Sequence, residues 1–110
     1  MNLKHKHIIL IVKYYPSKNG RLCSENAGIQ SAQECKEAQR KLKKYNSHFK
    51  ESMFAIATGN GYDLPFGCIS DTVSQKHYVY WNSEGSVISS DPRIKLICRY
   101  TNGQCSYETF

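Results

Sequence analysis

The clearest pattern of apolar and polar residues along the chain is that of one amphipathic helix beginning near residue 31. Five residues recur there at intervals of three and four, which places them on a single helix face that must be buried. They are Cys35, Ala38, Leu42, Tyr45 and Phe49. Ser31 and Glu34 have the spacing of a capping box, in which each side chain satisfies a backbone amide of the first turn. We therefore predict a helix that starts after Ser31 and runs towards Ser47.

Two later segments alternate as strands do. His77–Trp81 is the clearest strand by propensity, with Val79 and Trp81 on one face and Tyr78 and Tyr80 on the other. In the second segment the residues expected to face the core are Ile94, Leu96, Cys98 and Tyr100. Two shorter apolar runs are weaker strand candidates, Phe54–Ala57 and Val87–Ile88.

The dipeptide Asn102-Gly103 suits a two-residue type I′ turn, so we predict a hairpin after Tyr100. In that register Tyr100 lies opposite Cys105, which makes a direct bridge from Cys98 to Cys105 geometrically awkward. Cys105 is therefore predicted to be the unpaired thiol. It is either free in a monomer or linked to a second chain in a Cys105-linked dimer.

Residues 1–20 admit three interpretations. Lys4–His7 followed by Ile8–Val12 looks like the charged and apolar regions of a signal peptide, although the apolar run is short and no small-residue cleavage site follows. The alternatives are an added strand and a disordered tail. We favour the first, so residues 1–20 are expected to be a signal remnant or tail and the domain to span residues 21–110. The run is too short to cross a bilayer, and no integral membrane span is expected.

Five cysteines in 110 residues favour an oxidising compartment, and hence an extracellular or secretory location. Their spacing is not that of a zinc site, so we expect neither a metal nor another cofactor. Cys35 lies in the first helical turn and Cys68 follows a tight bend, and these two form the first expected disulfide. Cys98 faces the core from its strand, and Cys23 lies just ahead of the helix. These two form the second.

Together these elements predict a single α+β domain, with one main helix packed on a small antiparallel sheet of three to five strands and stabilised by disulfides. The length of 110 residues allows one domain with one modest core.

The order of the cysteines, with the short motifs around them, resembles a known type of small domain. The motifs are Cys23, Ser31-x-x-Glu34-Cys35-x-x-Ala38, Pro65-x-Gly67-Cys68, Val79-Tyr80-x-Asn82 and Ile97-Cys98. They are similar to those of uncharacterised cysteine-framed domains of marine microbial eukaryotes and their viruses, a family without an established activity. A looser similarity is to PAN/apple-type modules, which bind protein or carbohydrate, although the helix of this chain lacks their second cysteine. The resemblance implies the fold and the disulfides, and leaves Cys105 outside the four-cysteine frame.

The net charge of +6 suits a polyanionic partner such as nucleic acid, anionic lipid or acidic glycan. Arg40, Lys43 and Lys44 crowd the end of the predicted helix and are candidate ligand-binding residues. They also oppose the negative end of the helix dipole, so a solvated helix end is the plainer interpretation.

A metal-independent nuclease needs a general base, a general acid and cations for the phosphate. His48 and His77 are the candidate acid and base, with cations drawn from Arg40, Lys43 or Arg99. Local spacing does not bring the two histidines together. We keep a cationic secreted effector or small nuclease acting on anionic polymers as the alternative function.

The strand residues Tyr78, Tyr80 and Trp81 favour binding instead, because exposed aromatic rings stack on sugars and form protein hot spots. The competing interpretation places Val79 and Trp81 in the core and leaves the tyrosines outside as ordinary strand residues. We expect a secreted or surface binding module for a glycan or protein ligand, with no catalytic residue assigned.

Overall fold

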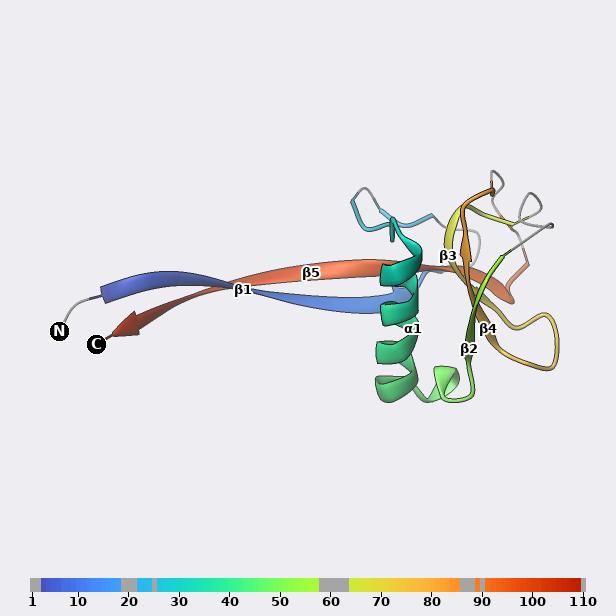
Figure 1. Ribbon diagram of the computed structural model, residues 1–110, viewed down its shortest axis with the longest axis horizontal. Coiled ribbons are helices and arrows are strands. Elements are labelled where there is room, and N and C mark those ends of the chain that lie inside the picture. Colours follow the sequence, from blue (N-terminus) through green and yellow to red (C-terminus); the bar gives the residue numbers. More distant parts are fainter. Residues whose placement is uncertain are drawn as a thin grey trace.

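The computed structural model describes residues 3–18, 22–24, 26–57, 64–85, 89 and 91–109. These residues form a five-stranded sheet in the order β1-β5-β3-β4-β2, with one α-helix against it (Figure 1). The strands are β1 Leu3–Pro16, β2 Met53–Ile56, β3 Gly67–Asp71, β4 Tyr78–Asn82 and β5 Ile94–Thr109. The helices are α1, Ala32–Tyr45, and the short 3₁₀ helix η1, Ser47–Phe49. The predicted disulfide-stabilised α+β class is confirmed.

The sheet is antiparallel except at one edge. β5 pairs antiparallel with β1 and with β3, and β3 pairs antiparallel with β4, whereas β2 pairs parallel with β4. β4 lies between β3 and β2 and runs in the same direction as β2, so β2 and β4 form a parallel pair. The weaker strand candidate Phe54–Ala57 corresponds to β2, while Val87–Ile88 lies outside the described residues.

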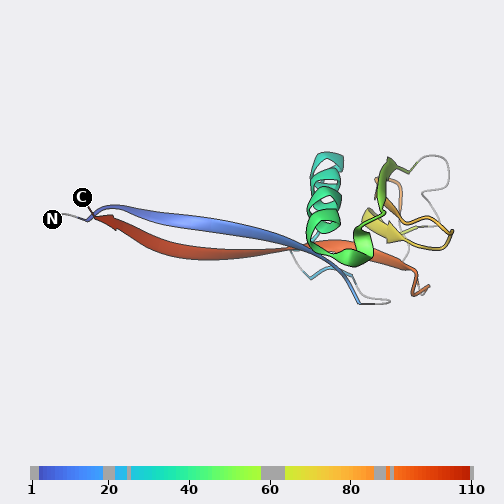
Figure 2. The same ribbon diagram turned by 90° about the horizontal axis from the view of Figure 1, so that it is seen from below.

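β1 and β5 form a long two-stranded ribbon that extends from the rest of the fold (Figures 1 and 2). It gives the molecule extents of 60 × 27 × 22 Å. The predicted hairpin at Asn102-Gly103 is wrong, because both residues lie inside β5, and Cys105 pairs in register with Ile8 instead of Tyr100. The dipeptide does not turn because β1 offers a continuous partner strand, and each further ladder pair extends β5.

Of the three interpretations of residues 1–20, the structure has the added strand for Leu3–Pro16. The end of this strand belongs to the folded body. Tyr14 packs against the core under α1, and the Ser17 amide donates a hydrogen bond of 2.7 Å to the Leu96 carbonyl. The folded unit thus takes in residues that precede residue 21.

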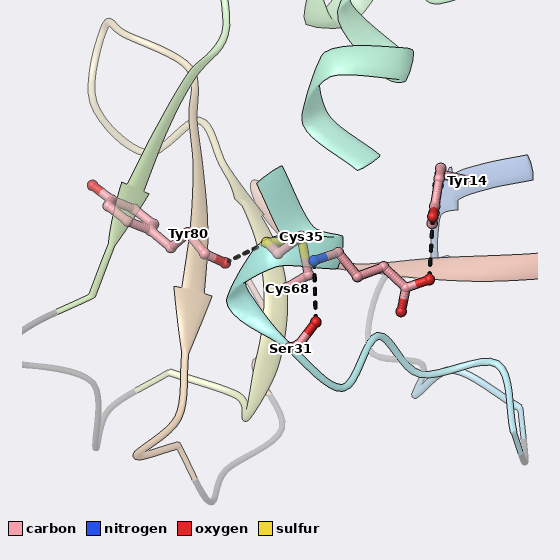
Figure 3. The surroundings of a disulfide bond; sticks show 6 residues. Tyr14, Ser31, Cys35, Cys68 and Tyr80 are labelled. Atoms are coloured by element: carbon pink, nitrogen blue, oxygen red, sulfur yellow. Dashed lines mark hydrogen bonds between the residues drawn. A yellow bond between two sulfur atoms is a disulfide. The ribbon is translucent and has the colours of Figure 1, made fainter. Parts of the chain in front are cut away.

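The helix α1 begins where the capping signal predicts. Ser31 is the N-cap, and its Oγ accepts a hydrogen bond of 3.1 Å from the Glu34 amide. The Glu34 carboxylate accepts a 3.1 Å hydrogen bond from the Tyr14 hydroxyl of β1 (Figure 3). It also lies 3.5 Å from the Arg99 Nε of β5. Burial, together with the charge of Glu34, raises the pKa of Tyr14 to about 12. The bond predicted for the Ser31 side chain is therefore present. The Glu34 side chain connects the first turn of α1 to β1 and β5.

The helix ends earlier than its apolar spacing predicts. The Asn46 amide caps the last turn by donating to the Leu42 carbonyl at 2.8 Å. Tyr45 is 78% exposed, so its assignment to the buried face is wrong. Phe49 is fully buried as predicted, but it comes from η1. Helical spacing does not predict which side chains are buried beyond Asn46, because the backbone of Asn46 is extended and the helix ends there.

Each face of the sheet carries a core of its own. The residues between α1 and the sheet are Ile29, Cys35, Ala38, Leu42, Phe49, Cys68, Val79 and Ile97. Those on the opposite face are Ala27, Ile69, Leu96 and Cys98. Side chains alternate across a strand, so consecutive residues of β3 serve different cores.

One disulfide lies in each core. Cys35–Cys68 joins α1 to β3 (Figure 3), and Cys23–Cys98 joins the segment before the helix to β5. Both predicted pairings are confirmed. Cys35, Cys68 and Cys98 are buried, which agrees with their assignment as structural cysteines.

Candidate functional site

The predicted tyrosines Tyr78 and Tyr80 lie together on the sheet face opposite α1. Their rings are close to parallel, with centroids 5.4 Å apart and planes at 18°. Both side chains are half-buried. Figure 3 shows the ring of Tyr80 on the other side of β4 from the Cys35–Cys68 disulfide. β4 therefore presents an aromatic pair away from the helix.

Strand pairing adds two neighbours to this pair. Met53 of β2 and Asp71 of β3 are both register partners of Tyr78, and residues directly across a sheet share a face. Met53 is 45% exposed. We call the group of Met53, Asp71, Tyr78 and Tyr80 the tyrosine face. Local sequence patterns do not identify Met53 or Asp71 as site residues, because such patterns do not reveal which strands become neighbours.

The tyrosine face combines apolar and polar groups. Burial raises the pKa of Tyr80 above 10.0, and the negative charge of Asp71 raises it further. The hydroxyl of Tyr80 therefore stays protonated at neutral pH and can donate a hydrogen bond. Asp71 Oδ1 accepts a 2.8 Å bond from the Val73 amide, and a carboxylate has further acceptor capacity. The site offers two flat rings, a donor and an acceptor.

Trp81 lies on the other face of the sheet. It is half-buried and packs against the core under α1, next to the fully buried Val79. Its ring meets the exposed ring of Phe66 edge to face, with centroids 5.5 Å apart. Trp81 is thus separated from the two tyrosines, and one ligand lying on the tyrosine face does not reach all three rings.

The candidate basic residues lie on α1, on the face of the sheet away from the tyrosines. Arg40 forms an exposed bidentate pair with Glu37, in which the Nε–Oε2 distance is 3.0 Å. Exposed pairs of this kind contribute little to stability. Lys43 and Lys44 are exposed in the last turn, and the Lys44 ammonium lies 5.2 Å from the ring centroid of Tyr45.

The two histidines that local spacing could not place together are neighbours in the fold. The ring centroids of His48 and His77 are 5.1 Å apart. His77 Nδ1 lies 3.1 Å from the His48 carbonyl oxygen, and its Nε2 lies 2.7 Å from the Ser70 hydroxyl. A carbonyl oxygen can only accept, so Nδ1 carries the proton and Ser70 donates to Nε2. Both nitrogens of His77 are therefore engaged.

This arrangement does not favour the nuclease alternative. A general acid and base need nitrogen atoms that face the substrate, whereas those of His77 bond to protein groups and Ser70 is buried. Two of the candidate phosphate ligands are also occupied, since Arg40 pairs with Glu37 and Arg99 pairs with Glu34. Through His77, which directly precedes β4, the pair instead links η1 to Ser70 of β3.

We expect the stability of the protein to fall as the pH drops below the ordinary His pKa of 6.5. Burial lowers the pKa of His77 in the folded state, so the unfolded chain binds more protons below that pH. The stabilisation is fully present above pH 6.5 and is lost as the pH falls towards the folded-state pKa. Urea titrations at about pH 7.5 and about pH 5.5 measure the difference in unfolding free energy between the two conditions. H77Q should lose most of this dependence and H48Q should keep it; an equal dependence in wild type and H77Q would contradict the assignment.

The described part of the chain holds no group of three or more His, Cys, Asp or Glu side chains that could bind a metal ion. Within the same residues, no helix is long and apolar enough to cross a membrane. A depression of about 710 Å³ along α1 includes Glu37 and Arg40, whose charges already satisfy each other.

No family model matches the chain, and neither a curated protein nor a solved structure matches it. The resemblance to cysteine-framed domains and to PAN/apple-type modules stays a prediction.

Proposed function

We propose that this protein is a secreted or cell-surface binding module that holds a glycan against the tyrosine face. The observation that supports it most is the parallel pair of Tyr78 and Tyr80 beside Asp71, in which Tyr80 packs against the second core with one side of its half-buried ring. The apolar face of a sugar ring stacks on aromatic rings, and its hydroxyls need nearby donors and acceptors. Tyr80 and Asp71 supply one of each.

The extracellular part of this proposal rests on the cysteines. Two disulfides, Cys23–Cys98 and Cys35–Cys68, lie in the two cores of a chain of 110 residues. Bridges of this kind form and persist in oxidising compartments. A protein ligand is the competing occupant of the tyrosine face, because exposed Met53 and the tyrosine rings also suit a hot spot.

We expect the oxidised protein to bind members of a glycan array and Y78A to bind the best of them at least about tenfold more weakly. Isothermal titration measures the affinities, and circular dichroism verifies that the variant is folded. Y100A is the matched control, since Tyr100 is 53% exposed and lies on β5 away from this site. H48Q should also bind normally, because a binding module does not need the histidine pair.

Two results would overturn the proposal. One is the absence of any array ligand for the folded, oxidised protein. The other is a ligand whose affinity is unchanged by Y78A but lost in H48Q, which would favour the nuclease alternative. The variant Y78F separates the roles of ring and hydroxyl: it should keep the stacking energy and lose at most the hydrogen bond.

A further inference from the structure

A groove lies between the C-terminal half of α1 and the strand β1, on the face of the sheet opposite the tyrosines. It has a volume of about 610 Å³. Its lining includes Val12, Tyr14, Lys41, Leu42, Tyr45 and Asn46. Leu42 is buried and Val12 half-buried, so the floor is apolar, whereas Tyr45 is 78% exposed at the rim. We call this feature the α1–β1 groove.

Two lysines lie against the rings of two tyrosines that line the groove. The Lys41 ammonium lies 5.7 Å from the ring centroid of Tyr14, and the Lys44 ammonium lies 5.2 Å from that of Tyr45. Within the described residues neither lysine forms an ion pair. The lining residues include no carboxylate. Cation–π contacts hold the ammonium groups in place and leave them available to an anion.

The backbone of β1 is also available at this position. β1 is the outermost strand of the sheet, and in the described structure its residues 12–14 pair with β5 alone. In an antiparallel pair, alternate residues direct their amide and carbonyl groups away from the partner strand. Such an edge accepts an extended peptide as an additional strand.

We propose that the α1–β1 groove binds an extended acidic segment of a partner protein. The segment adds a strand to β1, places an apolar side chain over Val12 and Leu42, and directs carboxylates to Lys41 and Lys44. A sulfated glycan would satisfy the two lysines but would leave the apolar floor unfilled, so the peptide is the better match. This binding goes beyond the proposed function and uses a different face of the sheet from the tyrosines.

The test is selection of a random peptide library on the folded, oxidised protein, followed by fluorescence polarisation with the best peptide, synthesised with a fluorescein label. We expect enriched peptides in which acidic and apolar residues alternate. K41A/K44A should weaken the binding by about tenfold or more, and added salt should weaken it further. K36A is the matched control, because Lys36 is an exposed lysine of the same helix outside the groove.

A second pair of measurements covers the rim and the strand edge. Y45A removes an exposed ring without disturbing the core and should also weaken binding of the peptide. Methylation of alternate backbone amides of the peptide should abolish binding by strand addition. The proposal fails if the library yields no acidic peptides, if K41A/K44A binds them as the wild type does, or if a heparin octasaccharide binds the groove and the peptides do not. None of these results depends on Tyr78, so a failure here leaves the proposed function standing.

Discussion

The double variant C35A/C68A should lose about 4 kcal/mol of unfolding free energy. The bridge closes a sequence separation of 33 residues, for which the chain-entropy model gives roughly 3.7 kcal/mol. Its removal also leaves a small void where two fully buried sulfur atoms packed. Domains of this size have a total stability of about 5–15 kcal/mol, so the variant should be marginal. Urea titration followed by the fluorescence of the single tryptophan, Trp81, measures the loss.

The companion variant C23A/C98A shows whether loop entropy or packing dominates. Its longer separation of 75 residues adds only about 0.7 kcal/mol in the same model, because closure entropy grows with the logarithm of loop length. Cys23 is only partly buried, so less packing is lost there. We therefore expect the two losses to agree within about 1 kcal/mol. A loss below about 1 kcal/mol in C35A/C68A would show that this bridge does not hold the helix on the sheet.

The variant F49A should cost about 3–5 kcal/mol, although Phe49 lies in a 3₁₀ helix of three residues. Its side chain is fully buried in the core under α1, and its ring centroid lies 4.6 Å from that of His77. Truncation removes a large apolar area and leaves a cavity that the disulfide-anchored core cannot collapse to fill. The same urea titration measures it.

F49L is the control for this prediction. Leucine keeps most of the buried apolar volume, so we expect a loss of less than about 2 kcal/mol. If F49A and F49L proved equally stable, η1 would not be part of the core. The pH dependence assigned to His77 should also weaken in F49A, because solvent would then reach the imidazole and reduce the burial that lowers its pKa.

The start of the helix and the faces of β4 were determined by the sequence itself. Ser31 caps α1 because its hydroxyl satisfies an amide only three residues away, which is a local interaction. The alternation of β4 separates Val79 and Trp81 from Tyr78 and Tyr80 for a similar reason, since successive side chains of any strand point to opposite faces. The cysteine pairing was predictable because Cys35 and Cys98 each occupied a position that had to be buried.

Only the tertiary structure decided the rest. β5 passes straight through Asn102-Gly103 because β1, about ninety residues earlier in the chain, pairs along it. In the same way, His48 meets His77, and Asp71 and Met53 meet Tyr78, through contacts between distant segments. A dipeptide or a hydrophobic period indicates only the conformational preference of the few residues within it. Which strands become neighbours depends on the burial and hydrogen bonding of the whole sheet. Both candidate binding surfaces lie where such distant segments meet.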